Sequence, residues 1–266
     1  MKSVVITGGT RGLGYELAKQ FRNKDYNVVI CGTKDETVNK AIESLSNESG
    51  KGLITGKKCN VSQLKEVEAL ANFAKEKCGS IDIWINNAGV NQSHKYAWEL
   101  DEKEIDSLLN IDLKGTINVT NVAMRNMIEQ NYGAIYNVEG HGSNDSFQSF
   151  LSLYGTAKRA VTYYTDAVAN EIKEKNLPII ICKLSPGIMI TDFLTSANGQ
   201  SHQIELSEKT KKVFNILGDY PDEIAAFLVQ GIENNKVNGK RIAWLTGFKI
   251  ATRFMTAGLN KRDFFK

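Results

Sequence analysis

The chain has 266 residues, 42% of them hydrophobic, which suits a single globular domain with one sizeable core. Its 33 basic side chains nearly balance its 30 acidic ones, and a net charge of +3 is too small to indicate a nucleic-acid-binding surface. The four cysteines are widely separated and form no CxxC pair. We therefore expect neither a disulfide framework nor a metal site.

The amino-terminal sequence "MKSVVITGGTRGLG" enters a strand and a glycine-rich loop directly. This leaves no room for the apolar run and cleavage site of a signal peptide. No segment reaches the roughly 18 to 20 apolar residues that a membrane-spanning helix needs. These features, with the unpaired cysteines, predict a cytoplasmic protein.

Short β-branched runs alternate with amphipathic stretches along the chain. The runs predict seven strands, at residues 3–6, 27–31, 52–58, 81–85, 133–138, 178–184 and 241–245. The stretches predict helices at residues 13–24, 36–47, 64–77, 101–130 and 154–175. This alternation is typical of an α/β fold, so we expect a Rossmann-type, doubly wound parallel sheet of seven strands with helices on both faces, a three-layer sandwich. We expect one domain over residues 1–266, with a substrate lid at about 188–220.

The sequence "TGGTRGLG" follows the first strand and opens the first helix. Its glycines permit a tight turn, and the amides at the helix start can bind a pyrophosphate. A structural strand-to-helix turn can look similar, so the loop alone is a weak signal. From this loop we expect cofactor contacts by Gly8, Thr10, Arg11, Gly12, Leu13 and Gly14.

The second strand ends in "CGTK", where dinucleotide-binding folds discriminate between ribose types. An acidic residue there would bind the ribose 2′-hydroxyl, but Gly32 stands in its place. Thr33, Lys34 and the nearby Arg11 instead favour a 2′-phosphate, which predicts NADP(H) in preference to NAD(H). The alternative is that Arg11 and Lys34 are ordinary solvated surface residues.

The next two strands also end in small polar residues. After the third strand, Asn60 and Val61 can border an adenine ring, and after the fourth comes "NNAG". Its small residues allow close backbone approach to a ligand, so Asn87, Ala88 and Gly89 are further candidates. Asn86 can serve a structural role by tying neighbouring strands together.

The motifs "TGGTRGLG", "NNAG", "YGTAK" and "SPG", in this order, resemble those of the short-chain dehydrogenase/reductase family over essentially the whole chain. The resemblance implies hydride transfer between nicotinamide and a carbonyl or alcohol, with Tyr154 as general acid. We expect Lys158, one helical turn away, to lower the pKa of Tyr154 and to bind the nicotinamide ribose. Asn110 matches the family's helix asparagine, which holds a water next to this lysine. The "SPG" segment would approach the nicotinamide through Pro186, Gly187, Ile188 and Thr191.

The family also places a serine after the fifth strand to hold the substrate oxygen. Here Glu139 and Gly140 occupy the usual position of the serine, and the first serine is Ser143, eleven residues before Tyr154 rather than the usual thirteen or so. Because the glycines of "GHGS" permit a sharp turn, we choose Ser143 as the catalytic serine. His141 lies at the customary spacing and remains an alternative donor.

The altered strand ending, with "KLSPGIMITDFL", "FNILGDYPDEIA" and "WLTGFK", resembles the subgroup that contains plant chlorophyll(ide) b reductases. We expect an oxidoreductase for a small-molecule carbonyl compound, which can be lipophilic. Two alternatives stay open: a 3-oxoacyl-thioester reductase, and a non-catalytic nucleotide-responsive binding protein. The family resemblance suggests a homodimer or homotetramer. The tail at 244–266 can pack against a neighbouring subunit or the lid, which we favour, or rest on a membrane surface.

Overall fold

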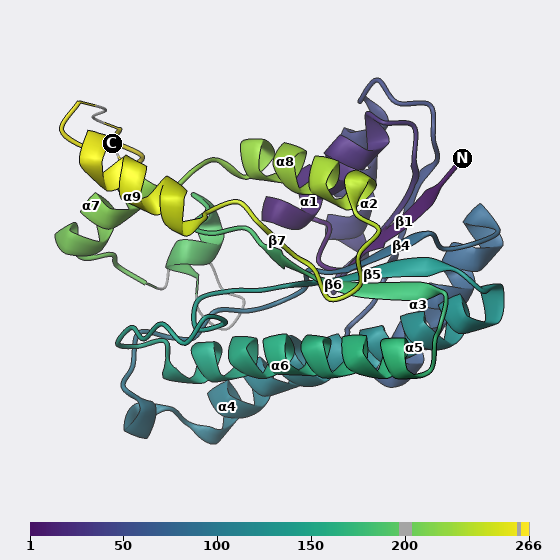
Figure 1. Cartoon of the computed structure of the whole chain (residues 1–266), viewed down its shortest axis with the longest axis horizontal. Coiled ribbons are helices and arrows are strands. Elements are labelled where there is room, and N and C mark those ends of the chain that lie inside the picture. Colours follow the sequence, from purple (N-terminus) through teal and green to yellow (C-terminus); the bar gives the residue numbers. More distant parts are fainter. Residues whose placement is uncertain (197–203, 260–261, 266) are drawn as a thin grey trace.

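The computed structural model describes residues 1–196, 204–259 and 262–265, and its arrangement is drawn in Figure 1. The part of the predicted lid at 197–203 lies outside the described residues. Among the described helices, none combines the length and apolar character needed to cross a bilayer.

A parallel sheet forms the centre of the molecule and confirms the predicted fold class. Its order is β3-β2-β1-β4-β5-β6-β7, and every neighbouring pair is parallel. The order reverses direction beside β1, so the crevice between the β1 and β4 ends is the expected ligand position. The strands are β1 Ser3–Ile6, β2 Asn27–Gly32, β3 Ile54–Lys58, β4 Ile83–Asn86, β5 Gly133–Val138, β6 Ile179–Ser185 and β7 Arg241–Ala243.

Helices cover both faces of the sheet and bury two separate cores against it (Figure 1). One face carries α1, α2 and α8, and the other carries α3, α4, α5 and α6. Because the inner strands are covered on both sides, most of their side chains are apolar in both alternating directions, whereas the edge strands β3 and β7 are partly exposed. The bounds are α1 Gly12–Arg22, α2 Asp35–Ser46, α3 Leu64–Cys78, α4 Glu102–Leu108, α5 Thr116–Gln130, α6 Ser152–Glu174 and α8 Pro221–Asn234.

The single helix predicted over residues 101–130 is interrupted. A π-helical turn, η2 at Leu109–Gly115, separates α4 from α5. A π turn accommodates an extra residue in the helical path and changes which side chains face the sheet. This turn contacts α6, so its geometry determines which of its side chains faces that helix.

The region after β6 forms a satellite layer together with the tail. It contains the short helix η3 Asp192–Thr195 and helix α7 Glu208–Leu217, and the tail contains α9 Gly247–Thr256. Figure 1 shows α7 and α9 together at one end of the molecule. Asp219 joins these pieces, because it pairs with Arg253 at 2.7 Å and with Arg262 at 2.9 Å. Within this chain the tail therefore packs against the lid region.

Candidate active site

A cavity of about 690 Å³ lies at the carboxyl ends of the strands, the edge where α/β sheets bind ligands. The structure brings most of the predicted site residues together around it. Those that line the cavity are Gly8, Thr10, Arg11, Gly12, Leu13, Gly32, Thr33, Asn60, Val61, Asn87, Ala88, Gly89, Tyr154, Lys158, Pro186, Gly187, Ile188 and Thr191.

Four predicted site residues are not among the described residues that line the cavity: Gly14, Lys34, Asn110 and Ser143. Gly14 lies beneath the loop, where an added Cβ would come within 2.3 Å of the Gly8 carbonyl oxygen. Its role is therefore close packing of the helix against the loop. Lys34 is exposed at the start of α2, next to the lining residue Thr33.

The glycine loop is shaped to receive a ligand along its backbone. Gly8 has φ +64°, a conformation that favours glycine, and a Cβ there would lie 2.9 Å from the Ala88 Cα. The side-chain amide of Asn87 donates to the carbonyl oxygens of Thr7 at 3.0 Å and Gly8 at 3.1 Å. The "NNAG" segment therefore holds the loop in place, and the start of α1 presents backbone amides to an anion.

Asn86 has the structural role considered from the sequence. Its amide donates to Thr120 Oγ1 at 3.0 Å and to Asn137 Oδ1 at 2.7 Å. All three residues are buried between β4, β5 and α5. Asn86 therefore connects β4 to its neighbours rather than to a ligand.

Tyr154 and Lys158 lie in the first turns of α6 and are both buried, at 7% and 5% exposure. The Lys158 ammonium is 5.5 Å from the centroid of the Tyr154 ring. Gln92, which we did not identify from the sequence, fixes the start of this helix. Its Oε1 accepts hydrogen bonds from the backbone N–H groups of Leu153 at 2.8 Å and Tyr154 at 3.1 Å, as a capping side chain does.

The partner of Lys158 is Asp112 in the π turn. Lys158 Nζ lies 3.1 Å from Asp112 Oδ2, and Asp112 is fully buried. The other carboxylate oxygen accepts from the Val90 N–H at 2.8 Å. Asp112 also lies against Gly89, where a Cβ would come within 3.0 Å of Oδ2. The carboxylate is thus held between the "NNAG" segment and the catalytic helix.

This arrangement corrects the prediction for Asn110. The residue that meets Lys158 is Asp112, two positions later. Residues two positions apart on a helix point to roughly opposite sides, so only one of Asn110 and Asp112 can face α6. The aspartate in "LNIDLKG" was visible in the sequence, but a regular helical period gave no reason to prefer it to the asparagine.

The ionisation of this group also differs from the expectation. Burial raises the pKa of Tyr154, Lys158 opposes the rise without cancelling it, and Asp112 adds to it. For Lys158, burial acts to lower the pKa, but Asp112 and Tyr154 outweigh it and the pKa is raised. Burial also raises the pKa of Asp112, against the influence of Lys158. The pKa of Tyr154 is therefore raised, mainly by burial, although Lys158 acts in the predicted direction and lowers it.

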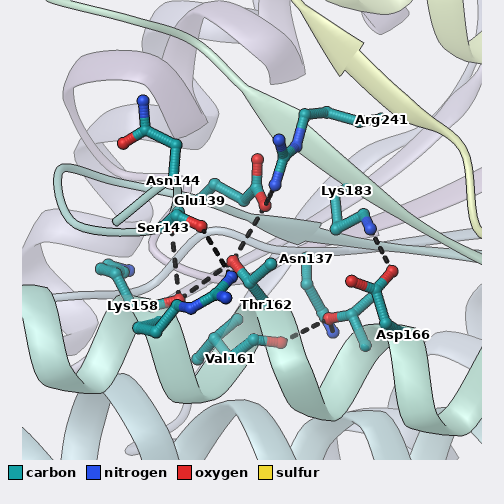
Figure 2. A network of polar contacts seen from close by, with 12 residues as sticks. Asn137, Glu139, Ser143, Asn144, Lys158, Val161, Thr162, Asp166, Lys183 and Arg241 are labelled. Carbon is teal, nitrogen blue, oxygen red and sulfur yellow. Dashed lines mark hydrogen bonds and ion pairs between the residues drawn. The ribbon is translucent and has the colours of Figure 1, made fainter. Parts of the chain in front are cut away.

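Ser143 is placed away from the cavity. Its hydroxyl donates to the Lys158 backbone oxygen at 3.3 Å and accepts from the Gly140 N–H at 3.2 Å. Figure 2 shows this hydroxyl directed at the backbone of α6. Ser143 is 4% exposed, so it braces the loop against the helix. The structure therefore contradicts the choice of Ser143 as the group that holds the substrate oxygen.

His141 lines the cavity instead. Its Nε2 is buried and has no hydrogen-bond partner among the described residues. Burial lowers the pKa of His141, which favours the neutral imidazole at pH 7. A buried polar atom without a partner beside a cavity indicates a place for a ligand atom.

Glu139, at the end of β5, connects three elements. Its carboxylate accepts from Thr162 Oγ1 of α6 at 2.9 Å and pairs with Arg241 of β7 at 2.8 Å (Figure 2). Glu139 also lines the cavity. These contacts fix the strand end from which the loop carrying His141 begins.

The sequence model of the family described as "short chain dehydrogenase" matches residues 2–202. The chain belongs to the short-chain dehydrogenase family. This membership confirms the family resemblance that the four motifs predicted. Among the residues that the structure describes, no three His, Cys, Asp or Glu side chains are grouped to hold a metal ion.

Plant proteins are among the similar family members. The chain is 31% identical over 280 residues to the "Probable chlorophyll(ide) b reductase NYC1, chloroplastic" of Oryza sativa, covering 99% of this chain and 54% of the plant protein. It is 33% identical over 261 residues to the "Chlorophyll(ide) b reductase NOL, chloroplastic" of the same species, covering 96% of this chain and 74% of that one. The predicted subgroup resemblance is confirmed, although the chain spans only about half the length of NYC1.

Solved structures share the fold at lower identity. An actinorhodin polyketide ketoreductase with NADPH superposes with a TM-score of 0.79 at 21% identity, over 93% of this chain and 97% of that one. A short-chain dehydrogenase from Burkholderia cenocepacia in complex with NADP gives a TM-score of 0.75 at 21% identity, over 91% and 95%. These similarities support the fold.

Proposed function

We propose that this protein is an NADP(H)-dependent carbonyl reductase in which Tyr154 protonates the substrate oxygen. The observation that carries the proposal is the buried pair of Tyr154 and Lys158 in the wall of a cavity that the glycine loop also lines, with Asp112 held against Lys158. When bound, the reduced nicotinamide supplies the hydride that adds to the carbonyl carbon. Tyr154 supplies the proton, so the product is an alcohol.

The cavity wall suits the cofactor. Gly8 and Gly12 of the glycine loop line the cavity, where the backbone amides at the start of α1 can bind a pyrophosphate. The preference for NADP(H) rests on the second strand, where Gly32 and Thr33 line the cavity in place of an acidic residue. Arg11 lines the same region, and a cation there suits a 2′-phosphate. The NADP and NADPH complexes of two structural neighbours are consistent with this preference.

We assign the stabilisation of the substrate oxygen to His141 rather than Ser143. A neutral imidazole with its proton on Nε2 can donate one hydrogen bond to a carbonyl oxygen as negative charge develops. His141 Nε2 has no hydrogen-bond partner within the described part of the chain, which supports this role. The two backbone contacts of Ser143 argue against an equal role for its hydroxyl.

Lys158 and Asp112 support the proton transfer. Once Tyr154 has given up its proton, its phenolate needs the nearby ammonium. Asp112 keeps Lys158 protonated and holds it in place between the π turn and α6. Asp112 is therefore a positioning residue that acts through the lysine.

The part of the cavity beyond the glycine loop is mostly apolar. Its wall includes the side chains of Leu151, Phe193, Leu206 and Phe214. Such a wall favours a bulky apolar carbonyl compound over a charged one. The names of the plant relatives, which are reductases of chlorophyll(ide) b, support a large substrate of this kind.

The test is NADPH oxidation by the purified protein with a panel of ketones, aldehydes and quinones, in parallel with a cofactor titration by fluorescence. We expect tight NADPH binding and turnover of apolar carbonyls. NADPH binding without oxidation across the whole panel would instead support a nucleotide-responsive binding protein.

A further inference from the structure

Four aromatic rings form a continuous row beside the cavity. The ring centroids of His94 and Phe150 are 4.6 Å apart, those of Phe150 and Tyr96 are 4.7 Å apart, and those of Tyr96 and Trp98 are 4.8 Å apart. The last pair is nearly parallel, with 4° between the ring planes. We call these residues the aromatic row.

The row begins at the cavity and ends in solvent. His94 lines the cavity, while Trp98 at the other end is 81% exposed. Tyr96 covers one face of the Trp98 indole, so the large exposed fraction leaves the opposite face open. The aromatic row therefore extends from the wall of the cavity to the surface of the protein.

The row stands on a braced frame rather than on a loosely held loop. Its rings come from the segments after β4 and after β5, and Gln92 connects these segments through its bonds to the start of α6. Glu104 of α4 holds the base of the row, since it accepts from Ser93 and pairs with Lys95 at 2.6 Å. Glu99 accepts from the Tyr96 N–H at 2.7 Å.

The backbone of Phe150 has an energetically unfavourable conformation. Its φ is +68°, in the left-handed region that residues with a side chain rarely adopt. This backbone carries the Phe150 ring into contact with both His94 and Tyr96. Strained backbone and exposed rings together are typical of a binding surface.

We propose that the aromatic row is an outer subsite that stacks a flat, conjugated ring system of the substrate while the carbonyl group reaches Tyr154 inside the cavity. This inference rests on the proposed function and adds the class of substrate, a carbonyl carried on an extended planar ring system. Stacking suits the row because rings that are offset or tilted at these centroid distances attract one another. The occupant is the substrate rather than a partner protein because the row is continuous with the cavity wall through His94.

The test compares two aldehydes, a short aliphatic one and a polycyclic aromatic one such as pyrene carboxaldehyde. In Trp98→Ala and Tyr96→Ala we expect kcat/KM for the polycyclic aldehyde to fall about tenfold, mainly through KM, because a stacking contact is lost. The short aldehyde should change less than about twofold, since it does not reach the row. Trp98→Phe, which keeps a ring, should retain most of the activity.

Tyr163→Ala is the matched control, because Tyr163 is also an exposed aromatic residue, at 75%, and is not among the residues that line the cavity. An equal loss for both aldehydes in the Trp98 and Tyr96 variants, or no loss for either, would overturn the proposal. So would sedimentation showing that Trp98→Ala dissociates an oligomer, because a second copy would then cover the row.

A binding measurement separates failure of this inference from failure of the proposed function. Of the three tryptophans, Trp84 is fully buried and Trp244 is packed under Lys249, which leaves Trp98 as the exposed reporter. Quenching of its fluorescence by the polycyclic aldehyde supports the subsite even if no NADPH is oxidised. Turnover of both aldehydes without quenching, and without the tenfold loss, supports the enzyme and contradicts the subsite.

Discussion

Lys158 and Asp112 form a buried ion pair with 3.1 Å between Nζ and Oδ2. The pair joins the π turn to the start of the catalytic helix and leaves Tyr154 beside a lysine whose charge is already balanced. A lysine without this partner would stabilise the Tyr154 phenolate more strongly. The carboxylate therefore influences both the position of the lysine and the acidity of the tyrosine.

Replacing Asp112 with Asn should shift the pH dependence of turnover. Asp112 raises the pKa of Tyr154, so its removal lowers that pKa. Reduction needs the protonated tyrosine, and activity is lost as pH rises through this pKa. The alkaline limb of kcat for reduction should therefore move to lower pH, and alcohol oxidation should gain activity at lower pH.

The control for this shift is Asn110→Ala, which changes a residue of the same turn that does not pair with Lys158. It should leave both pH limbs in place. An unchanged profile in Asp112→Asn, or an equal shift in the control, would refute the assigned influence of Asp112.

Replacing His141 should mainly lower kcat, whereas replacing Ser143 should mainly lower the melting temperature. His141→Ala should lower kcat about a hundredfold, the usual cost of losing one donor to a developing oxyanion. His141→Gln, which keeps an N–H donor, should recover part of the activity. Ser143→Ala should lower the melting temperature by a few degrees while kcat changes less than about threefold, because its two contacts are structural. The opposite pattern in kcat would return the role to Ser143.

Cofactor preference should respond to charge at the end of β2. Lys34→Ala and Arg11→Ala should each weaken NADPH binding about tenfold, with NADH changed little, because the 2′-phosphate loses a cation. Thr33→Asp should weaken NADPH binding further, because its carboxylate repels the 2′-phosphate. We choose Thr33 because a side chain at Gly32 would crowd Thr10.

Lys40→Ala, which changes an exposed lysine farther along α2, is the control. Equal effects on both nucleotides, measured by fluorescence titration, would count against the preference.

Asp219 should control the attachment of the tail to the lid region. It is 4% exposed and pairs with Arg253 and Arg262, so Asp219→Asn should cost about 2 to 4 kcal/mol. We expect a lower melting temperature and faster tryptic cleavage in the tail. Asp106→Asn, at an exposed position of α4, should change neither.

The contribution of Asp219 should also depend on pH. Burial acts to raise the pKa of Asp219, but hydrogen bonds from Arg253 and Trp244 outweigh it and the pKa is lowered. A carboxyl with a lowered pKa in the folded state stabilises the fold above its unfolded pKa of about 4. This stability is lost as pH falls from there through the folded-state pKa. A difference in stability between wild type and Asp219→Asn that does not shrink as the pH falls below about 4 would contradict this account.

The sequence predicted the parallel sheet, and it predicted most of the residues that line the cavity, for a physical reason. The inner strands are buried on both faces, so most of their residues are apolar, and the glycines of the first loop have backbone requirements that few other residues meet. The alternation of strands and helices predicted a parallel sheet, and the structure adds the strand order that forms the crevice beside β1.

The remaining parts depend on features that leave little trace in local sequence. The π turn preserves an apparently regular apolar pattern over 101–130, so the sequence could not show whether Asn110 or Asp112 faces Lys158. The direction of the Ser143 hydroxyl depends on α6, which lies later in the chain. The aromatic row combines two loops whose contact exists only in the folded molecule.

The central claim, that Tyr154 is the proton donor, is tested most directly by Tyr154→Phe. The measurement is kcat for NADPH oxidation with the best carbonyl substrate of the wild type, together with the Kd for NADPH. We expect kcat to fall by about a thousandfold or more, because general acid catalysis is lost, while the Kd changes less than about threefold. Turnover close to that of the wild type would contradict the account.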